Sequence, residues 1–366
     1  MNPSKLIACM IVLCLGTSAG YALDTPPSPD PTASLMGRIA DREQAALEAR
    51  GVVLVAPSLS DYLQGVADRL WHRTAVDDMA SPSVLVVIDS RIDAYAYPNG
   101  RCCLTTGMLD ILEHESQLAM ILAHELVHYA RRHTASFYGQ FKETTHHDDR
   151  RDGGSADTTG VPAMRRAVET AERQADEEGL SILGAAGYDQ TEVLTLMSTL
   201  TQQMSTRGRA AAAGQLEKRA AFFRERVAGT PDKQGVADRR DYLERIAPAL
   251  IANAQSALRR GDWDQAQRSI ARFMQVRPVD ALAYYLNGEI MRRREGGDRF
   301  LNCVGSYRRA LEIDPSFPPA HRALGELYFK AGRFQQAKPH FETFLSLAPE
   351  DTAGAFIKGY LRQCQN

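Results

Sequence analysis

The chain lacks a charge of one dominant sign, and it lacks long apolar runs beyond its first residues. Lys and Arg total 43 against 45 Asp and Glu, which gives a net charge of -2 and a pI near 6.5. This balance gives no electrostatic reason to expect binding to nucleic acid or to an acidic membrane surface. After the N-terminus, no stretch approaches the ~20 apolar residues that a membrane-spanning helix needs. We therefore expect the processed protein to be soluble.

The N-terminal residues 1–22 are predicted to be a signal peptide. Lys5 supplies a positive start, Leu6–Leu15 an apolar core, and Gly20 and Ala22 small residues close to a cleavage point. Export follows from this pattern, and we expect a periplasmic protein, peripheral to the outer membrane if it is membrane-associated at all.

Few cysteines remain after such processing. The Pro-rich leader at 23–34 should be stiff and extended, and it contains no cysteine. The four cysteines that remain after removal of the signal peptide are Cys102, Cys103, Cys303 and Cys364. An oxidising compartment allows pairing, but the neighbours Cys102 and Cys103 cannot bridge each other without strain, and sequence does not reveal connectivity.

The most informative segment is the run His124-Glu125-Leu126-Val127-His128. It lies in a predicted amphipathic helix over 116–132, where residues four apart share a face, so both imidazoles point the same way while Glu125 projects about 100° around the axis. The apolar run 119–123 before it argues for burial, and buried polar groups need partners. The pattern indicates half of a zinc site, with a solvated helix that carries the residues by chance as the alternative.

A catalytic zinc ion usually has three protein ligands and a position left for water. A second predicted helix, 164–183, is rich in acids, and Glu172 and Asp176 share one face of it. Glu172 could reach the metal, and Asp176 could orient a ligand imidazole from behind. Taken alone, this helix is interpreted more simply as a solvent-facing charged helix.

Two short strands are predicted upstream, a buried one at 84–88 and an edge-like one at 93–97 that ends at Pro98-Asn99-Gly100. The simplest role for Tyr95 and Tyr97 is packing around a small sheet.

Five stretches occur in a set order along the chain: Asp93–Gly100, Leu104–Gly107, His124–His128 with His133, Glu172–Gly179 and Ala186–Asp189. In order and spacing they resemble the HtpX/CAAX-prenyl-protease-like zinc metallopeptidase family, over roughly residues 35–189. The resemblance implies a zincin-like peptidase that binds one zinc ion per chain through His124, His128 and Glu172. It also implies that Glu125 is the general base.

In the same family, the equivalent of the edge strand borders the substrate cleft. The resemblance therefore implies that Ala94, Tyr95 and Ala96 bind an extended substrate through main-chain hydrogen bonds.

Two segments remain ambiguous. Gly139–Pro162 contains His146 and His147 without an apolar period and is interpreted as a mobile lid, its histidines in solvent rather than on the metal. Many exported relatives carry a His-Pro dipeptide after the ligand helices, but the matching pair here is Thr230-Pro231. A histidine latch at that point is therefore not expected.

The C-terminal part shows a period of ~34 residues. Prolines at 278, 315 and 349 follow helical patterns, preceded at constant offsets by Trp263, Phe300 and Phe334, and Gly296-Gly297 accounts for a longer interval. This pattern resembles the tetratricopeptide repeat. Such helix pairs stack and expose a concave surface that binds protein segments, although a purely stabilising appendage is an alternative.

Together these features predict an α+β, predominantly helical chain. A zinc metallopeptidase domain at 35–240 contains a small β-sheet, and an all-α tetratricopeptide solenoid follows at 241–366. The resemblance implies that the protein cleaves unfolded or misassembled envelope proteins, with the outer-membrane β-barrel assembly machinery as a candidate partner. The alternative is a chaperone or assembly adaptor whose protease site is mostly silent.

Overall fold

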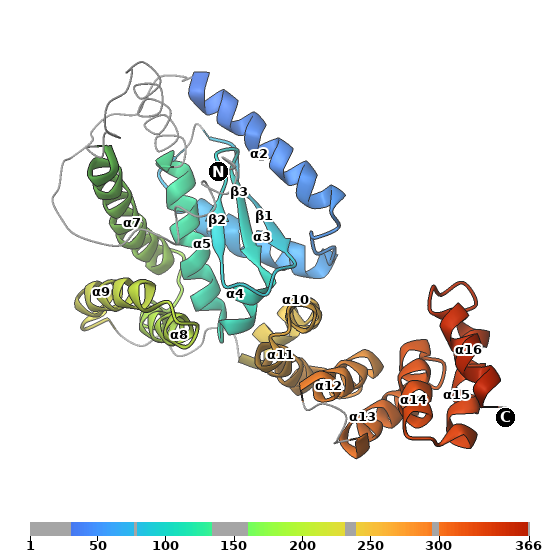
Figure 1. Ribbon diagram of the computed structural model, residues 1–366. Helices are drawn as coiled ribbons and strands as arrows, with labels where there is room; N and C mark the ends of the chain where they lie inside the picture. The colour runs from blue at the N-terminus through green and yellow to red at the C-terminus, as the bar shows by residue number, and fades with distance from the viewer. Residues whose placement is uncertain (1–30, 77–78, 134–159, 231–238, 295–299, 365–366) are drawn as a thin grey trace, which may run out of the picture. The chain divides into compact units, whose positions relative to one another are not determined.

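The computed structural model describes residues 31–76, 79–133, 160–230, 239–294 and 300–364 (Figure 1). The predicted signal peptide, the Gly296-Gly297 pair and the histidines of the predicted lid lie outside these ranges. The chain divides into two compact units, Met1–Ile246 and Ala247–Asn366. The predicted fold class is confirmed, since one small sheet accompanies many helices and the C-terminal unit is built from helix pairs.

The sheet of the first unit has three strands in the order β1-β3-β2. β3 (Arg101–Thr105) pairs in parallel with β1 (Ser83–Val87) and antiparallel with β2 (Ala94–Ala96). β1 and β2 coincide with the two predicted strands, and β2 lies at an edge of the sheet. The sequence pattern does not predict β3, because Cys102, Cys103 and Leu104 are all buried and the strand shows no alternation of apolar and polar residues.

Helices pack around this sheet (Figure 1). α3 contacts β1, while α5 contacts β2, β3 and α7, and α8 and α9 form a hairpin. Their bounds are α2 Pro31–Ala49, α3 Pro57–Trp71, α4 Thr106–Ile111, α5 Glu115–Ala130, α7 Gly160–Ala185, α8 Glu192–Thr206 and α9 Ala210–Val227. α5 and α7 are the two helices predicted to carry the metal ligands.

α2 begins at Pro31, so residues 31–34 of the expected leader are helical rather than extended. Proline is tolerated in the first turn of a helix, because its missing N–H has no intrahelical partner there.

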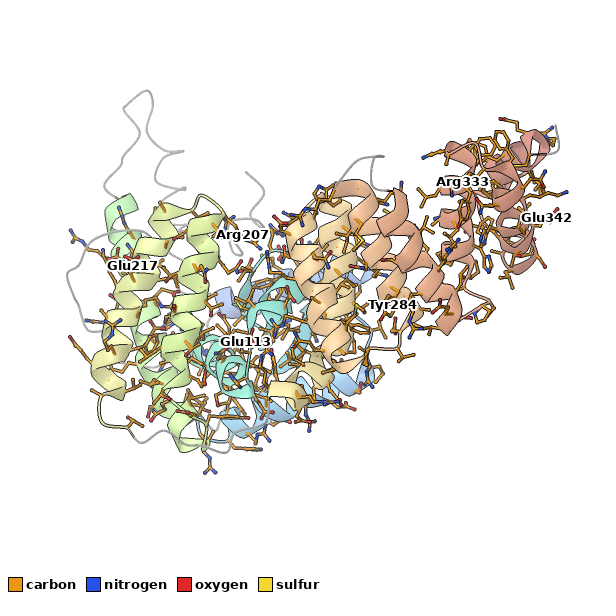
Figure 2. The ribbon with its side chains drawn as sticks, turned by 90° about the horizontal axis from the view of Figure 1, so that it is seen from below. Glu113, Arg207, Glu217, Tyr284, Arg333 and Glu342 are labelled. Atoms are coloured by element: carbon orange, nitrogen blue, oxygen red, sulfur yellow. The ribbon has the colours of Figure 1, made fainter. Side chains whose placement is uncertain are left out.

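The first turns of α10 (Arg239–Arg260) belong to the first unit. Arg239 pairs with Glu113, which lies in the turn between α4 and α5 and is labelled in Figure 2. The buried Tyr242 donates a hydrogen bond from its hydroxyl to the carbonyl of Leu109 at 3.3 Å. The two units separate inside this helix, between Ile246 and Ala247.

The second unit contains the helix pairs that the repeat predicts. The part of α10 from Ala247 onward packs with α11 (Trp263–Val276), α12 (Ala281–Arg294) pairs with α13 (Phe300–Ile313), and α14 (Pro318–Lys330) pairs with α15 (Phe334–Leu347). The last helix is α16 (Gly354–Gln363). Gly288 and Gly325 occupy matching places on α12 and α14, where an added Cβ would lie 2.6 Å from the ring of Tyr307 and 2.5 Å from that of Phe341. A glycine on the first helix of a pair thus admits an aromatic ring from the second. The exposed Arg333 and Glu342 project from the last helix pair (Figure 2).

All four cysteines expected in the processed chain are buried. None of the helices in the described ranges combines the length and apolar character needed to cross a bilayer.

The packing of His340 predicts a pH-dependent stability of the repeats. Its Nδ1 lies 3.1 Å from Nδ1 of His321, and the ring of Tyr328 stacks on it. Burial, together with the charges of His321 and Arg308, lowers the pKa of His340 to about 4. The ordinary pKa of histidine is about 6.5, so the unfolded chain binds the proton more readily and the folded repeats lose stability as pH falls from about 6.5 toward 4.

The measurement is the free energy of unfolding of wild type and His340→Asn between pH 7.5 and 4.5. The advantage of the wild type over the variant should shrink as the pH falls, and two parallel pH curves would contradict the assignment.

Candidate metal centre

α5 carries two of the three predicted ligands in the centre of the first unit. Every residue of this helix from Glu115 to Tyr129 is buried except Ile121, so the apolar run that predicted burial does lie in the core. His124, Glu125 and His128 are 6%, 3% and 2% exposed. The surface-helix alternative is therefore excluded for this segment.

α7 carries Glu172 and Asp176 against α5. Its Ala171, Ala175 and Leu183 are buried, as the small apolar face predicted. Gly179 sets the close approach of the two helices, because an added Cβ there would lie 3.2 Å from the backbone nitrogen of His124. The acid-rich helix α7 therefore packs on α5, which carries His124 and His128, instead of lying in solvent.

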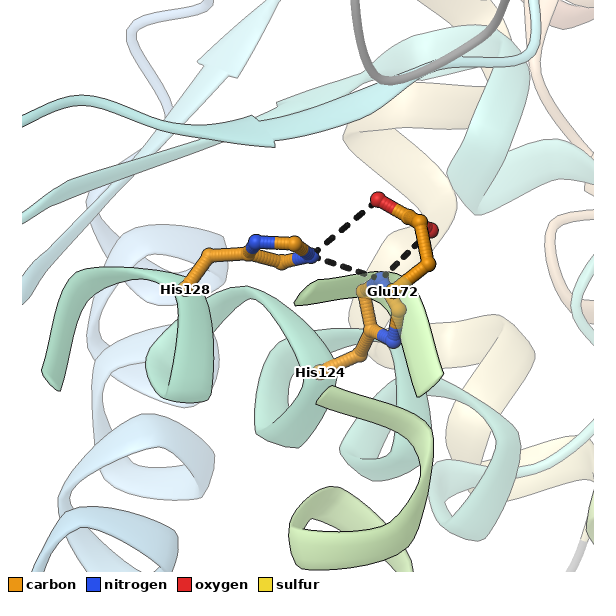
Figure 3. Close-up of side chains that lie close together, drawn as sticks. All are labelled: His124, His128 and Glu172. Carbon is orange, nitrogen blue, oxygen red and sulfur yellow. Dashed lines mark hydrogen bonds and ion pairs between the residues drawn. The ribbon is translucent and has the colours of Figure 1, made fainter. Parts of the chain in front are cut away.

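The structure brings His124, His128 and Glu172 together (Figure 3). Nε2 of His124 lies 3.1 Å from Nε2 of His128 and 3.5 Å from Oε2 of Glu172, and Nε2 of His128 lies 3.4 Å from Oε1 of Glu172. Ligands about 2.0–2.2 Å from one zinc ion in tetrahedral geometry lie at similar distances from one another. Oε1 of Glu172 is also buried without a hydrogen-bond partner, as expected of an atom that binds a metal ion. The three residues thus fit a divalent metal.

Each imidazole is oriented from behind by a hydrogen bond. Asp176 Oδ1 lies 3.0 Å from Nδ1 of His124, and since a carboxylate only accepts, that nitrogen donates and Nε2 presents its lone pair to the metal position. On the other side, Nε2 of His133 donates to Gln174 Oε1 at 3.2 Å, so its Nδ1 can accept from Nδ1 of His128 at 3.1 Å. With Nδ1 as the donor in both rings, Nε2 is the nitrogen that each imidazole can offer to a metal ion.

The electrostatics of the metal-free centre are dominated by burial and by these contacts. Burial acts to lower the pKa of His124, but Asp176 and Glu172 outweigh it and raise the pKa to about 10. Burial acts to raise the pKa of Glu172, but the two imidazoles hold that pKa well below its usual range. A metal ion must consequently displace a proton from His124 when it binds.

Glu125 lies in a different environment, where burial has the largest effect on its carboxyl. Burial raises the pKa of its carboxyl, an effect that His124 and His128 reduce, and its Oε2 is buried without a hydrogen-bond partner. Near it lies Asp93, immediately before β2, whose pKa is raised to about 7 by burial and by the charge of Glu125.

The three residues predicted to bind substrate lie on β2, which packs against α5. Tyr95 is opposite Cys103 in the ladder, and its ring packs on Tyr97 at 5.3 Å, so the packing role predicted for the two tyrosines is what the structure shows. Asp93 and Tyr97 bond to β3, so by alternation Tyr95 does too, while Ala94 and Ala96 turn their backbone polar groups to the other side. Of the three, Tyr95 is therefore the least suited to main-chain contact with a substrate.

Sequence reasoning missed Arg219, on α9, whose guanidinium contacts Asp176. No signal marks it, because it lies 43 residues beyond Asp176 on a helix interpreted only as a packing element. His133 was left between a structural and an exposed position, and its contact with His128 shows that it is structural.

Comparison with known proteins agrees with this geometry. Residues 57–225 match the family model of peptidase family M48, and residues 247–272 and 318–351 match tetratricopeptide-repeat models.

Three curated relatives share the beta-barrel assembly-enhancing protease name. The Escherichia coli (strain K12) protein is 23% identical over 224 residues, which cover 55% of this chain and 46% of that protein. A Vibrio cholerae protein that carries the name provisionally is 27% identical over 157 residues, covering 37% and 32%, and the Yersinia pestis protein is 27% identical over 122 residues, covering 33% and 23%. The chain thus spans less than half the length of each relative.

Proposed function

We propose that this chain, in which an M48 peptidase domain is joined to tetratricopeptide repeats, is a zinc-dependent endopeptidase. The observation that carries the proposal is the convergence of His124, His128 and Glu172 from two helices, with their ligand atoms within 4.8 Å of one another. A two-histidine, one-glutamate set with both imidazoles oriented from behind is typical of a catalytic zinc site.

In this mechanism His124, His128 and Glu172 hold the metal, and Asp176 keeps His124 in its ligand orientation. Zinc in such a site polarises a carbonyl and lowers the pKa of water to about 7. Glu125, one residue from a ligand and buried, accepts the proton of the attacking water on a carboxylate oxygen. The same carboxyl then donates that proton to the nitrogen of the departing amine.

Metal analysis of the purified protein, paired with cleavage of a casein-type unfolded substrate, tests the proposal. We expect about one zinc ion per chain and cleavage that stops with a chelator and returns with zinc. Cleavage that continues after complete removal of metal would refute it.

We further propose that the substrate adds to the outer side of β2 as an extended strand. Support comes from the edge position of β2, its packing against α5 and the outward backbone groups of Ala94. Strand addition recognises backbone more than side chains, so specificity should be loose and unfolded segments should be preferred.

If the substrate binds as an added strand, N-methylation of its backbone should slow cleavage at every second position of the peptide. In a set of otherwise identical peptides, each N-methylated at one position, alternate positions should lose a main-chain hydrogen bond and about 2- to 10-fold in kcat/KM. The intervening positions serve as matched controls. Loss without alternation would argue for a different substrate conformation.

We also propose that the protein is exported and acts on unfolded or misassembled envelope proteins, with the repeats docking either substrate or the outer-membrane assembly machinery. The reference to beta-barrel assembly in the relatives' name and the presence of the repeats support this proposal. In the alternative, the chain is mainly a chaperone or assembly adaptor, which the array of stacked helix pairs favours. An inactive Glu125→Gln protein that still rescues envelope defects in a deletion strain would favour the adaptor. Loss of rescue would favour proteolysis.

A further inference from the structure

Arg219 reaches the metal centre from the side of Asp176. Its Nε donates to Asp176 Oδ2 at 2.8 Å and its Nη2 to Asp176 Oδ1 at 2.5 Å. Nη2 also lies 3.4 Å from Nδ1 of His124, and Nη1 lies 3.8 Å from Oε2 of Glu172. One side chain thus contacts the residue that orients a ligand and lies close to two of the three ligands.

This contact constrains the direction of His124. The Asp176 side chain is only 3% exposed, and its Oδ1 is the atom that bonds the imidazole. A carboxylate held by the imidazole alone could rotate, whereas a guanidinium that bonds both of its oxygens fixes its plane. The orientation of the ring therefore depends on Arg219 as well as on Asp176.

We propose that Arg219 is a positioning residue of the metal centre, which fixes the Asp176 carboxylate and through it His124. The inference rests on the proposed metal site. Arg219 belongs to α9, so this contact attaches a helix that carries no ligand to the two helices that do.

A second physical effect has the opposite sign and allows a sharp test. A guanidinium close to a divalent ion repels it, so removing the charge alone should tighten metal binding. Loss of a partner that orients a ligand instead weakens metal affinity, by 10- to 100-fold for groups that contact a ligand directly. The direction of the change in affinity therefore separates positioning from simple repulsion.

The experiment measures the zinc dissociation constant of the full processed chain by competition with a chelating dye. We expect Arg219→Gln to weaken zinc binding about 10-fold, and Arg219→Lys, which keeps the charge but loses the two-pronged contact, to recover only part of it. Arg226→Gln is the matched control, because Arg226 joins the same two helices through Glu177 at 2.7 Å, with both side chains 50% exposed. Its zinc affinity should equal that of the wild type.

A double variant tests whether Arg219 acts through Asp176. In an Asp176→Asn background, the further change Arg219→Gln should alter zinc affinity by less than about twofold, because the carboxylate it fixes is gone. If Arg219→Gln does not fold, the zinc affinity of Arg219→Lys is compared with that of the wild type instead. Unchanged or tighter zinc binding by the arginine variants overturns the positioning role, whereas a wild type that binds no zinc overturns the proposed function instead.

Discussion

Replacing Glu125 with glutamine is expected to stop peptide hydrolysis while leaving the metal bound. Glutamine has nearly the same shape as glutamate but cannot accept the proton of the attacking water, and general acid–base catalysis contributes about 100- to 10,000-fold. Glu125 is not among the three converging ligands, so zinc content should stay near one per chain. The measurement is kcat/KM on an unfolded protein substrate together with metal analysis.

The environment of Glu125 makes this variant informative. Its side chain is buried, and Oε2 has no hydrogen-bond partner, so the substitution breaks no hydrogen bond at that atom. Thermal unfolding should therefore remain close to that of the wild type. Full activity in a folded, zinc-loaded Glu125→Gln protein would remove Glu125 from the mechanism.

Replacing Glu172 with glutamine is expected to lower zinc affinity more than about 100-fold, beyond the loss typical of groups that only support a ligand. The substitution removes the one negative charge among the three converging side chains. The two carboxylate oxygens of Glu172 lie 3.5 Å from Nε2 of His124 and 3.4 Å from Nε2 of His128. Activity should fall in parallel at limiting zinc. Zinc titrations of the metal-free protein measure the effect.

Thermal stability provides an independent reading of the same change. A ligand that binds only the folded state stabilises it in proportion to the logarithm of its concentration, so micromolar zinc should raise the Tm of the wild type and have little effect on the variant. Glu177→Gln, an exposed substitution on the same helix, should respond to zinc as the wild type does. Equal zinc stabilisation of wild type and Glu172→Gln would exclude Glu172 as a ligand.

The part of the centre that sequence predicts is the part set by helix periodicity. His124 and His128 share a face because they are four apart, and the same holds for Glu172 and Asp176. That the two pairs meet depends on the packing of α5 and α7, which periodicity alone does not determine. The resemblance to a family supplied that pairing, and the structure brings the groups together.

The contacts that sequence does not predict are those made by single side chains across long separations. Arg219 reaches the centre through tertiary packing, and nothing in its local sequence distinguishes it from other polar residues on helices. β3 was missed for a related reason, since a strand covered on both faces has no alternating pattern.

The close approach at Gly179 means that the width of the centre is determined by backbone, not by the residues that coordinate. A methyl group there would meet the His124 backbone at 3.2 Å and push the helices apart by a few tenths of an ångström, whereas metal–ligand distances tolerate only about 0.2 Å. A homologous chain with a larger residue at this position could keep the equivalents of His124, Glu125, His128 and Glu172 and still be a poor metalloenzyme. Inspection of its motifs would classify it as active, and only the spacing of its helices would reveal the loss.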